Sequence, residues 1–153
     1  LGMQVERAKP ATLSLQLSNQ QSTINKQLAY NEPMRTFRFL DFKVYQEAKM
    51  FHREIVEICK TFPKEYFYLA DQLKRCSLSI VLNIAEGSAK RSDKDFNRYL
   101  ENSLGSVSEG VACLDVALSV NLIKREKFDE LIVKAESIKK QIGGFSKKLL
   151  FSK

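Results

Sequence analysis

The chain has 153 residues, 44% of them hydrophobic and 28% charged, and this composition predicts one soluble globular domain rather than a disordered protein. Its formal net charge of +7 favours a polyanionic partner, nucleic acid above all. The apolar runs are shorter than the ~20 residues of a membrane span, and the N-terminus lacks the apolar core of a signal peptide. We therefore expect a cytoplasmic protein.

The N-terminal region differs from the rest of the chain. Residues 1–38 are rich in Gln, Ser, Asn and Thr and show no sustained apolar period, so we expect a flexible tail there. Met34 stands just before the patterned region, so residues 1–33 need not belong to the native protein. The folded domain is predicted to comprise residues 39–153.

Helical periodicity begins near Asp41. The predicted apolar stripe of the first helix is Val44, Ala48, Phe51, Ile55 and Ile58. Pro63 ends this helix and suits the first turn of the next one. The second stripe is Leu69, Leu73, Cys76, Ile80 and Ile84. Gly87 is expected to close the second helix as a left-handed cap.

Two more helices follow. The spacing of Ser92 and Asp95 predicts a capping box at the start of the third helix. Its stripe is Phe96, Leu100, Ser103, Val107, Gly110, Leu114 and Leu118. The small residues at which another helix could approach closely are Ser103, Gly105, Ser106 and Gly110. The fourth stripe is Phe128, Leu131, Ala135, Ile138, Ile142, Phe145 and Leu149.

The connections between these helices are short, and no strand pattern occurs. Gly143 and Gly144 would weaken the fourth helix by about 1 kcal/mol each relative to alanine. The sequence therefore predicts an all-α protein, an up-down-up-down four-helix bundle.

Residues suited to catalysis or metal binding are scarce. The three cysteines are Cys59, Cys76 and Cys113, without a C-x-x-C pair, and His52 is the only histidine. We expect no metal and no cofactor, and buried reduced thiols. Phosphate-cradling glycine loops and nucleophile elbows are absent, so we expect a protein that is not an enzyme. An RNA-cleaving enzyme, in which His52 would take part, stays as a third alternative.

Asn83 and Glu86 lie three residues apart, so they share one face of the second helix. They could form a polar functional site. They could also be structural, with Glu86 paired to Lys90 or Arg91 and Asn83 hydrogen-bonded to a neighbouring helix or subunit. We favour the structural interpretation, because no second acid, histidine or metal ligand accompanies the carboxylate.

An up-down-up-down bundle would gather basic residues at one end. The residues concerned are Arg35, Arg38, Lys43, Lys90, Arg91, Lys94, Lys147, Lys148 and Lys153, and Arg98 continues the face of Arg91 and Lys94. At the opposite end, acidic residues dilute Lys60, Lys64, Lys124, Arg125 and Lys127. Lysine and arginine in such a collar suit nucleic-acid phosphates, which they contact without reading bases.

Three segments resemble a known family. They are "FLDFKVYQEA", "FPKEYFYLADQLKRCSLSIVLNIAEGSAKRSDKDFNRYL" and "SLGSVSEG". The chain is similar over about residues 37–151 to four-helix-bundle proteins encoded in 23S rRNA intervening sequences. It is also similar to the accessory variability determinants of diversity-generating retroelements.

The resemblance implies a homopentameric ring with a central channel and no established enzymatic activity. It also implies nucleic-acid binding, at least in the retroelement branch, where the bundle partners a reverse transcriptase. Asn83, Glu86 and Gly87 match the family's structural signature, and Arg75, Lys90 and Arg91 match basic positions. The predicted nucleic-acid contacts are Lys74, Arg75, Lys90, Arg91, Lys94, Arg98, Lys147 and Lys148. Two functions stay open: sequence-independent binding of RNA or DNA, and protein interaction as an accessory subunit of a reverse transcriptase or another nucleic-acid enzyme.

Overall fold

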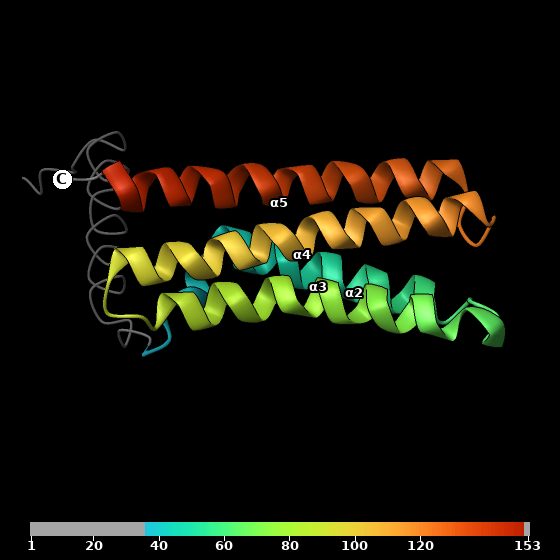
Figure 1. Cartoon of the computed structure of the whole chain (residues 1–153), viewed down its shortest axis with the longest axis horizontal. Coiled ribbons are helices and arrows are strands. Elements are labelled where there is room, and N and C mark those ends of the chain that lie inside the picture. Colours follow the sequence, from blue (N-terminus) through green and yellow to red (C-terminus); the bar gives the residue numbers. More distant parts are fainter. Residues whose placement is uncertain (1–35, 152–153) are drawn as a thin grey trace, which may run out of the picture. The chain divides into compact units, whose positions relative to one another are not determined.

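The computed structural model describes residues 36–151, which form helices connected by short turns (Figure 1). The elements in chain order are η1 (Arg38–Asp41), α2 (Lys43–Cys59), η2 (Lys64–Tyr66), α3 (Phe67–Ser88), α4 (Asp93–Ser119) and α5 (Arg125–Phe151). No strand occurs within this range, which confirms the all-α prediction. The expectations for the tail up to residue 35 and for Lys153 lie outside the described residues.

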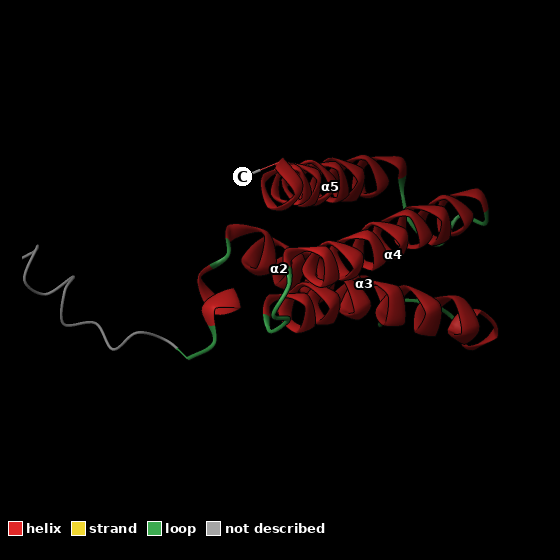
Figure 2. Cartoon of the chain, turned by 60° about the vertical axis from the view of Figure 1, so that its left-hand side comes forward, coloured by secondary structure: helices red, strands yellow, loops and turns green. Residues whose placement is uncertain are grey.

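Successive helices run in opposite directions (Figures 1 and 2), so the bundle is up-down-up-down. Each helix packs against its neighbours in the chain, and α5 also packs against α2. As a result, the start of α2, the α3–α4 turn and the end of α5 lie at one end, which we call the basic end. None of the described helices is long and apolar enough to cross a membrane.

The core contains most of the predicted stripe residues. The buried members of the four stripes are Val44, Ala48, Phe51, Ile55, Leu69, Leu73, Cys76, Ile80, Ile84, Phe96, Leu100, Ser103, Val107, Gly110, Leu114, Leu131, Ala135, Ile138 and Ile142. Ile58 and Leu118 were predicted to be core residues but are only partly buried. Their neighbours Cys59 and Ala117 are buried instead. Phe128, Phe145 and Leu149 pack at the edge of the core.

Gly87 corrects one prediction. It is not a left-handed cap, because α3 continues to Ser88 and no described glycine has a positive φ. A Cβ on Gly87 would fall 2.6 Å from Cδ2 of Phe96 and 2.8 Å from Cβ of Tyr99. The glycine is therefore needed so that α3 and α4 can approach closely.

The other helix ends agree better with the predictions made from the sequence. Ser92 Oγ accepts a hydrogen bond from the Asp95 amide at 3.0 Å and donates one to Asp95 Oδ2 at 2.7 Å, which confirms the cap of α4. Pro63 precedes the 3-10 turn η2 rather than α3 itself. In the α4–α5 turn, Asn121 adopts φ 59°, a left-handed conformation that asparagine tolerates better than most residues.

The small residues of α4 divide into two groups. Ser103, Ser106 and Gly110 are buried. Ser103 Oγ donates to the Ile80 carbonyl of α3 at 3.0 Å. Gly105 is exposed, and a Cβ there would meet nothing within 4 Å. Of the four positions predicted to allow close approach of another helix, three are therefore buried inside the bundle, and Gly105 is not.

Candidate nucleic-acid interface

Three phenylalanines pack against one another at the basic end, and we call them the phenylalanine support. The ring of Phe145 on α5 lies edge-on to those of Phe42 and Phe96, with both centroids 5.1 Å away. Ser146 Oγ also donates a hydrogen bond to Asn97 Oδ1 of α4. These contacts join the beginning of α2, the beginning of α4 and the end of α5, so they fix the positions from which basic side chains project.

Arg38 has a structural role at this end. Its Nε donates to the Ser88 carbonyl at 2.9 Å, and its guanidinium lies 5.6 Å from the centre of the Phe96 ring. The Ser88 carbonyl belongs to the last turn of α3, where carbonyls have no partner within the helix. The side chain therefore connects η1 to the α3–α4 corner.

Lys90 is held within the α3–α4 corner by its neighbours. Its Nζ lies 3.2 Å from Glu86 Oε1 and 4.5 Å from the centre of the Tyr99 ring. Tyr99 donates its hydroxyl to the same carboxylate at 2.7 Å, and this bond, followed by that of Lys90, lowers the pKa of Glu86. The Glu86–Lys90 pair predicted from the sequence is confirmed. Arg98 packs on Tyr99, its guanidinium 5.5 Å from the ring centre.

Arg91 and Lys94 are exposed and form no ion pair with any described residue. They flank the capped start of α4, where Asp93 and Asp95 are also exposed. The two acids offset part of the local positive charge. This corner is therefore only weakly basic by itself.

The two halves of α5 differ sharply in charge compensation. In the first half, Arg125 pairs with Asp129 at 3.0 Å, Lys127 with Glu130 at 2.9 Å, and Lys134 with Glu54 of α2 at 2.7 Å. The second half contains Lys139, Lys140, Lys147 and Lys148. None of these four pairs with an acid in the described chain, and no acidic residue occurs between positions 137 and 151.

Lys139 and Lys140 were missed by the sequence reasoning, which selected only Lys147 and Lys148 from this helix. The sequence does contain a feature that could have indicated them, because no acidic residue follows Glu136. Lys43, at the start of α2, is also highly exposed and only loosely associated with Glu47, at 3.7 Å.

Two predicted contacts lie away from the basic end. Lys74 and Arg75 are in the first half of α3, toward the opposite end of the bundle. Lys74 pairs with Asp71 at 2.8 Å. Of the eight predicted contacts, the structure therefore places six at the basic end: Lys90, Arg91, Lys94, Arg98, Lys147 and Lys148. Lys74 and Arg75 do not belong to this group.

Asn83 makes its direct hydrogen bonds within its own helix. Its Nδ2 donates to the Ser79 carbonyl at 2.8 Å and to Ser79 Oγ at 3.0 Å. Ser79 Oγ in turn lies 2.9 Å from Ser106 Oγ of α4. The predicted link from Asn83 to a neighbouring helix within the chain is therefore indirect, through Ser79.

Cys59 and Cys76 are buried in the core, as predicted, whereas His52 and Cys113 are only half-buried. His52 Nδ1 lies 2.8 Å from Ser77 Oγ of α3, and burial lowers the pKa of the imidazole. All three thiols are free, and burial raises the pKa of Cys59 to about 11 and that of Cys76 to about 12. Among the described residues, no three His, Cys, Asp or Glu side chains are grouped as metal ligands.

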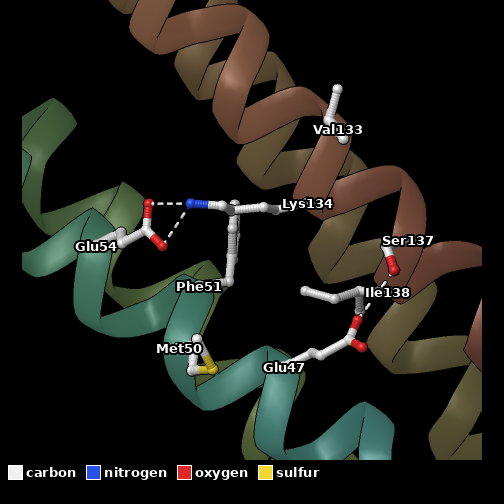
Figure 3. Close-up of a pocket in the computed structure, with 8 residues that line it drawn as sticks. All are labelled: Glu47, Met50, Phe51, Glu54, Val133, Lys134, Ser137 and Ile138. Carbon is white, nitrogen blue, oxygen red and sulfur yellow. Dashed lines mark hydrogen bonds and ion pairs between the residues drawn. The ribbon is translucent and has the colours of Figure 1, made fainter.

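A groove between α2 and α5 is the main alternative site (Figure 3). Its volume is about 280 Å³, with Phe51 and Ile138 among its lining residues. Glu54 pairs with Lys134, and Glu47 accepts a hydrogen bond from Ser137 at 2.9 Å. Because the charged groups of the groove already have partners, it offers no free acid, base or nucleophile.

Comparisons with known proteins give a family and a fold. The sequence profile of the 23S rRNA-intervening sequence proteins matches residues 40–144. A crystal structure of a protein of unknown function from Bacteroides thetaiotaomicron VPI-5482, of the S23 ribosomal protein family, is similar with a TM-score of 0.65. The identity is 24%, over 68% of this chain and 98% of that one, so the likeness establishes the fold. A comparison with curated proteins finds no match.

Proposed function

Because the chain belongs to the 23S rRNA-intervening sequence protein family, we propose that it is a non-catalytic bundle that binds RNA or DNA through phosphates at its basic end. The observation that carries the proposal is the uncompensated charge of α5. The three cations in the first half of that helix, Arg125, Lys127 and Lys134, each have an acidic partner. Lys139, Lys140, Lys147 and Lys148 have none among the described residues.

Uncompensated lysines suit a phosphate ligand for a physical reason. An ammonium group is a compact point charge that needs no fixed geometry, and binding a polyanion releases condensed counterions. Arg91 and Lys94 are exposed at the α3–α4 corner, which lies at the same end of the bundle as the end of α5. The phenylalanine support holds these segments together, so one nucleic acid could contact both.

A titration of the full chain against labelled duplex RNA, single-stranded RNA and duplex DNA tests the proposal. We expect a dissociation constant in the micromolar range or tighter at low salt, with affinity falling as salt rises. Lys147→Gln/Lys148→Gln should weaken binding to each ligand. Lys64→Gln/Lys124→Gln, which removes the same charge at the opposite end, should weaken it less. Absence of binding at low salt would overturn the proposal.

Protein interaction is the second candidate function, favoured by exposed leucines on α3. Leu78 and Leu82 lie one helical turn apart and are 41% and 55% exposed. Such side chains could contact further copies in the homopentameric ring that the family resemblance implies, or a reverse transcriptase. A pull-down after nuclease treatment separates the two candidates, because a protein partner is retained and a nucleic-acid-mediated one is lost.

A further inference from the structure

The exposed side of α5 is hollowed where two glycines follow one another. The hollow measures about 630 Å³ and all its lining residues belong to this helix: Glu136, Lys139, Lys140, Gly143, Gly144 and Lys147. Gly144 also borders a second hollow of about 360 Å³, between α5 and the start of α2, with Lys43 and Lys148 on its rim. We call the first hollow the lysine notch.

The bundle itself has no packing need for these glycines. A Cβ on Gly143 or Gly144 would meet nothing within 4 Å, in contrast to Gly87. A glycine inside a helix is less favourable than an alanine. The pair therefore leaves the backbone of α5 open to approach from outside, at some expense of helix stability.

We propose that the lysine notch seats the sugar-phosphate backbone of a nucleic acid against the main chain of α5. Lys139 and Lys147 lie eight residues apart, which is about 12 Å along a helix. That length corresponds to roughly three or four nucleotides of one duplex strand at ~3.4 Å each. This proposal rests on the proposed function. It adds a second contact region, which extends from the basic end along the side of the bundle.

The lining favours nucleic acid over an acidic protein. Protein interfaces concentrate aromatic and apolar anchors at their centre and are poor in lysine. The lysine notch has lysines and glycines and no apolar or aromatic side chain, with Glu136 at its margin. A phosphate strand needs positive charge and access rather than an apolar pocket.

Filling the notch without changing its charge gives the sharpest test. Gly143→Ala/Gly144→Ala should leave the melting temperature unchanged or raise it, and should weaken binding of duplex RNA or DNA by roughly tenfold (about 1.4 kcal/mol). Gly105→Ala is the matched control, because Gly105 is also an exposed helix glycine with nothing within 4 Å of an added Cβ. It should bind as the unmodified chain does.

A second pair of variants tests the charges. Lys139→Gln/Lys140→Gln should reduce the slope of log affinity against log salt by about 2, if each lysine neutralises one phosphate. Lys64→Gln/Lys124→Gln should change it less. If the unmodified chain binds and both notch variants bind equally well, the notch proposal fails alone; if the unmodified chain binds no nucleic acid, both proposals fail. Notch-dependent binding of poly-glutamate without binding of nucleic acid would identify an acidic protein partner and overturn both.

Discussion

Gly87 of α3 lies directly against the Phe96 ring of α4, with room for a hydrogen atom but not for a methyl group. Gly87→Ala should therefore destabilise the bundle by about 1–3 kcal/mol through overpacking, although alanine favours helices. Urea unfolding measures the change. Gly105→Ala adds the same methyl group in open space and should be neutral or slightly stabilising. Equal stability of the two variants would contradict the close approach.

The cap of α4 provides a second prediction. Ser92→Ala removes the acceptor for the Asp95 amide and should lower the free energy of unfolding by about 1 kcal/mol. Ser92→Asn keeps a capping oxygen and should retain most of the stability. Urea unfolding of both variants checks this. A loss of the same size in the asparagine variant would show that the hydroxyl acts in some other way.

The partial burial of His52 predicts a pH dependence of stability. Burial holds the pKa of His52 below 6.5 in the folded chain, so the unfolded chain binds more protons as the pH falls. The contribution of neutral His52 to the free energy of unfolding is complete above about pH 6.5, and it is lost as the pH falls through the pKa of the folded chain. Between pH 7.5 and 5.5, urea unfolding should show a larger loss for the unmodified chain than for His52→Gln. Parallel losses would exclude this role.

The exposed leucines of α3 provide a test of self-association. If they are buried between copies, Leu78→Ser/Leu82→Ser should convert the assembly to smaller species, as measured by light scattering or sedimentation. Val133→Ser is the control, because Val133 is 67% exposed on α5. It should leave the mass unchanged. An assembly of unchanged mass in the leucine variant would place the interface elsewhere.

The fold could be predicted because its main determinants are local. Apolar residues at steps of three and four mark the buried face of each helix, and Ser92 with Asp95 marks a helix start. Gly87 was misinterpreted because a glycine permits either a positive φ or a close approach. The ring of Phe96 decides between these, and its position depends on how two helices pack.

The candidate site was less predictable, because charge compensation depends on partners in space. The pair of Glu54 with Lys134 joins residues that are 80 positions apart, so the sequence does not reveal it. Lys74 was a different case. Its partner Asp71 is three residues earlier, and this local spacing could have removed Lys74 from the predicted contacts.

The contrast between the halves of α5 implies that a rise in ionic strength changes the local stability of the two halves in opposite directions. Added salt screens the attraction that Glu54 and Glu130 exert on Lys127 and Lys134, and it also relieves the mutual repulsion of the lysines beyond Glu136. The first half should then loosen while the second half tightens. Amide hydrogen exchange, followed residue by residue along α5 at low and high salt, would show the two trends crossing within a single helix.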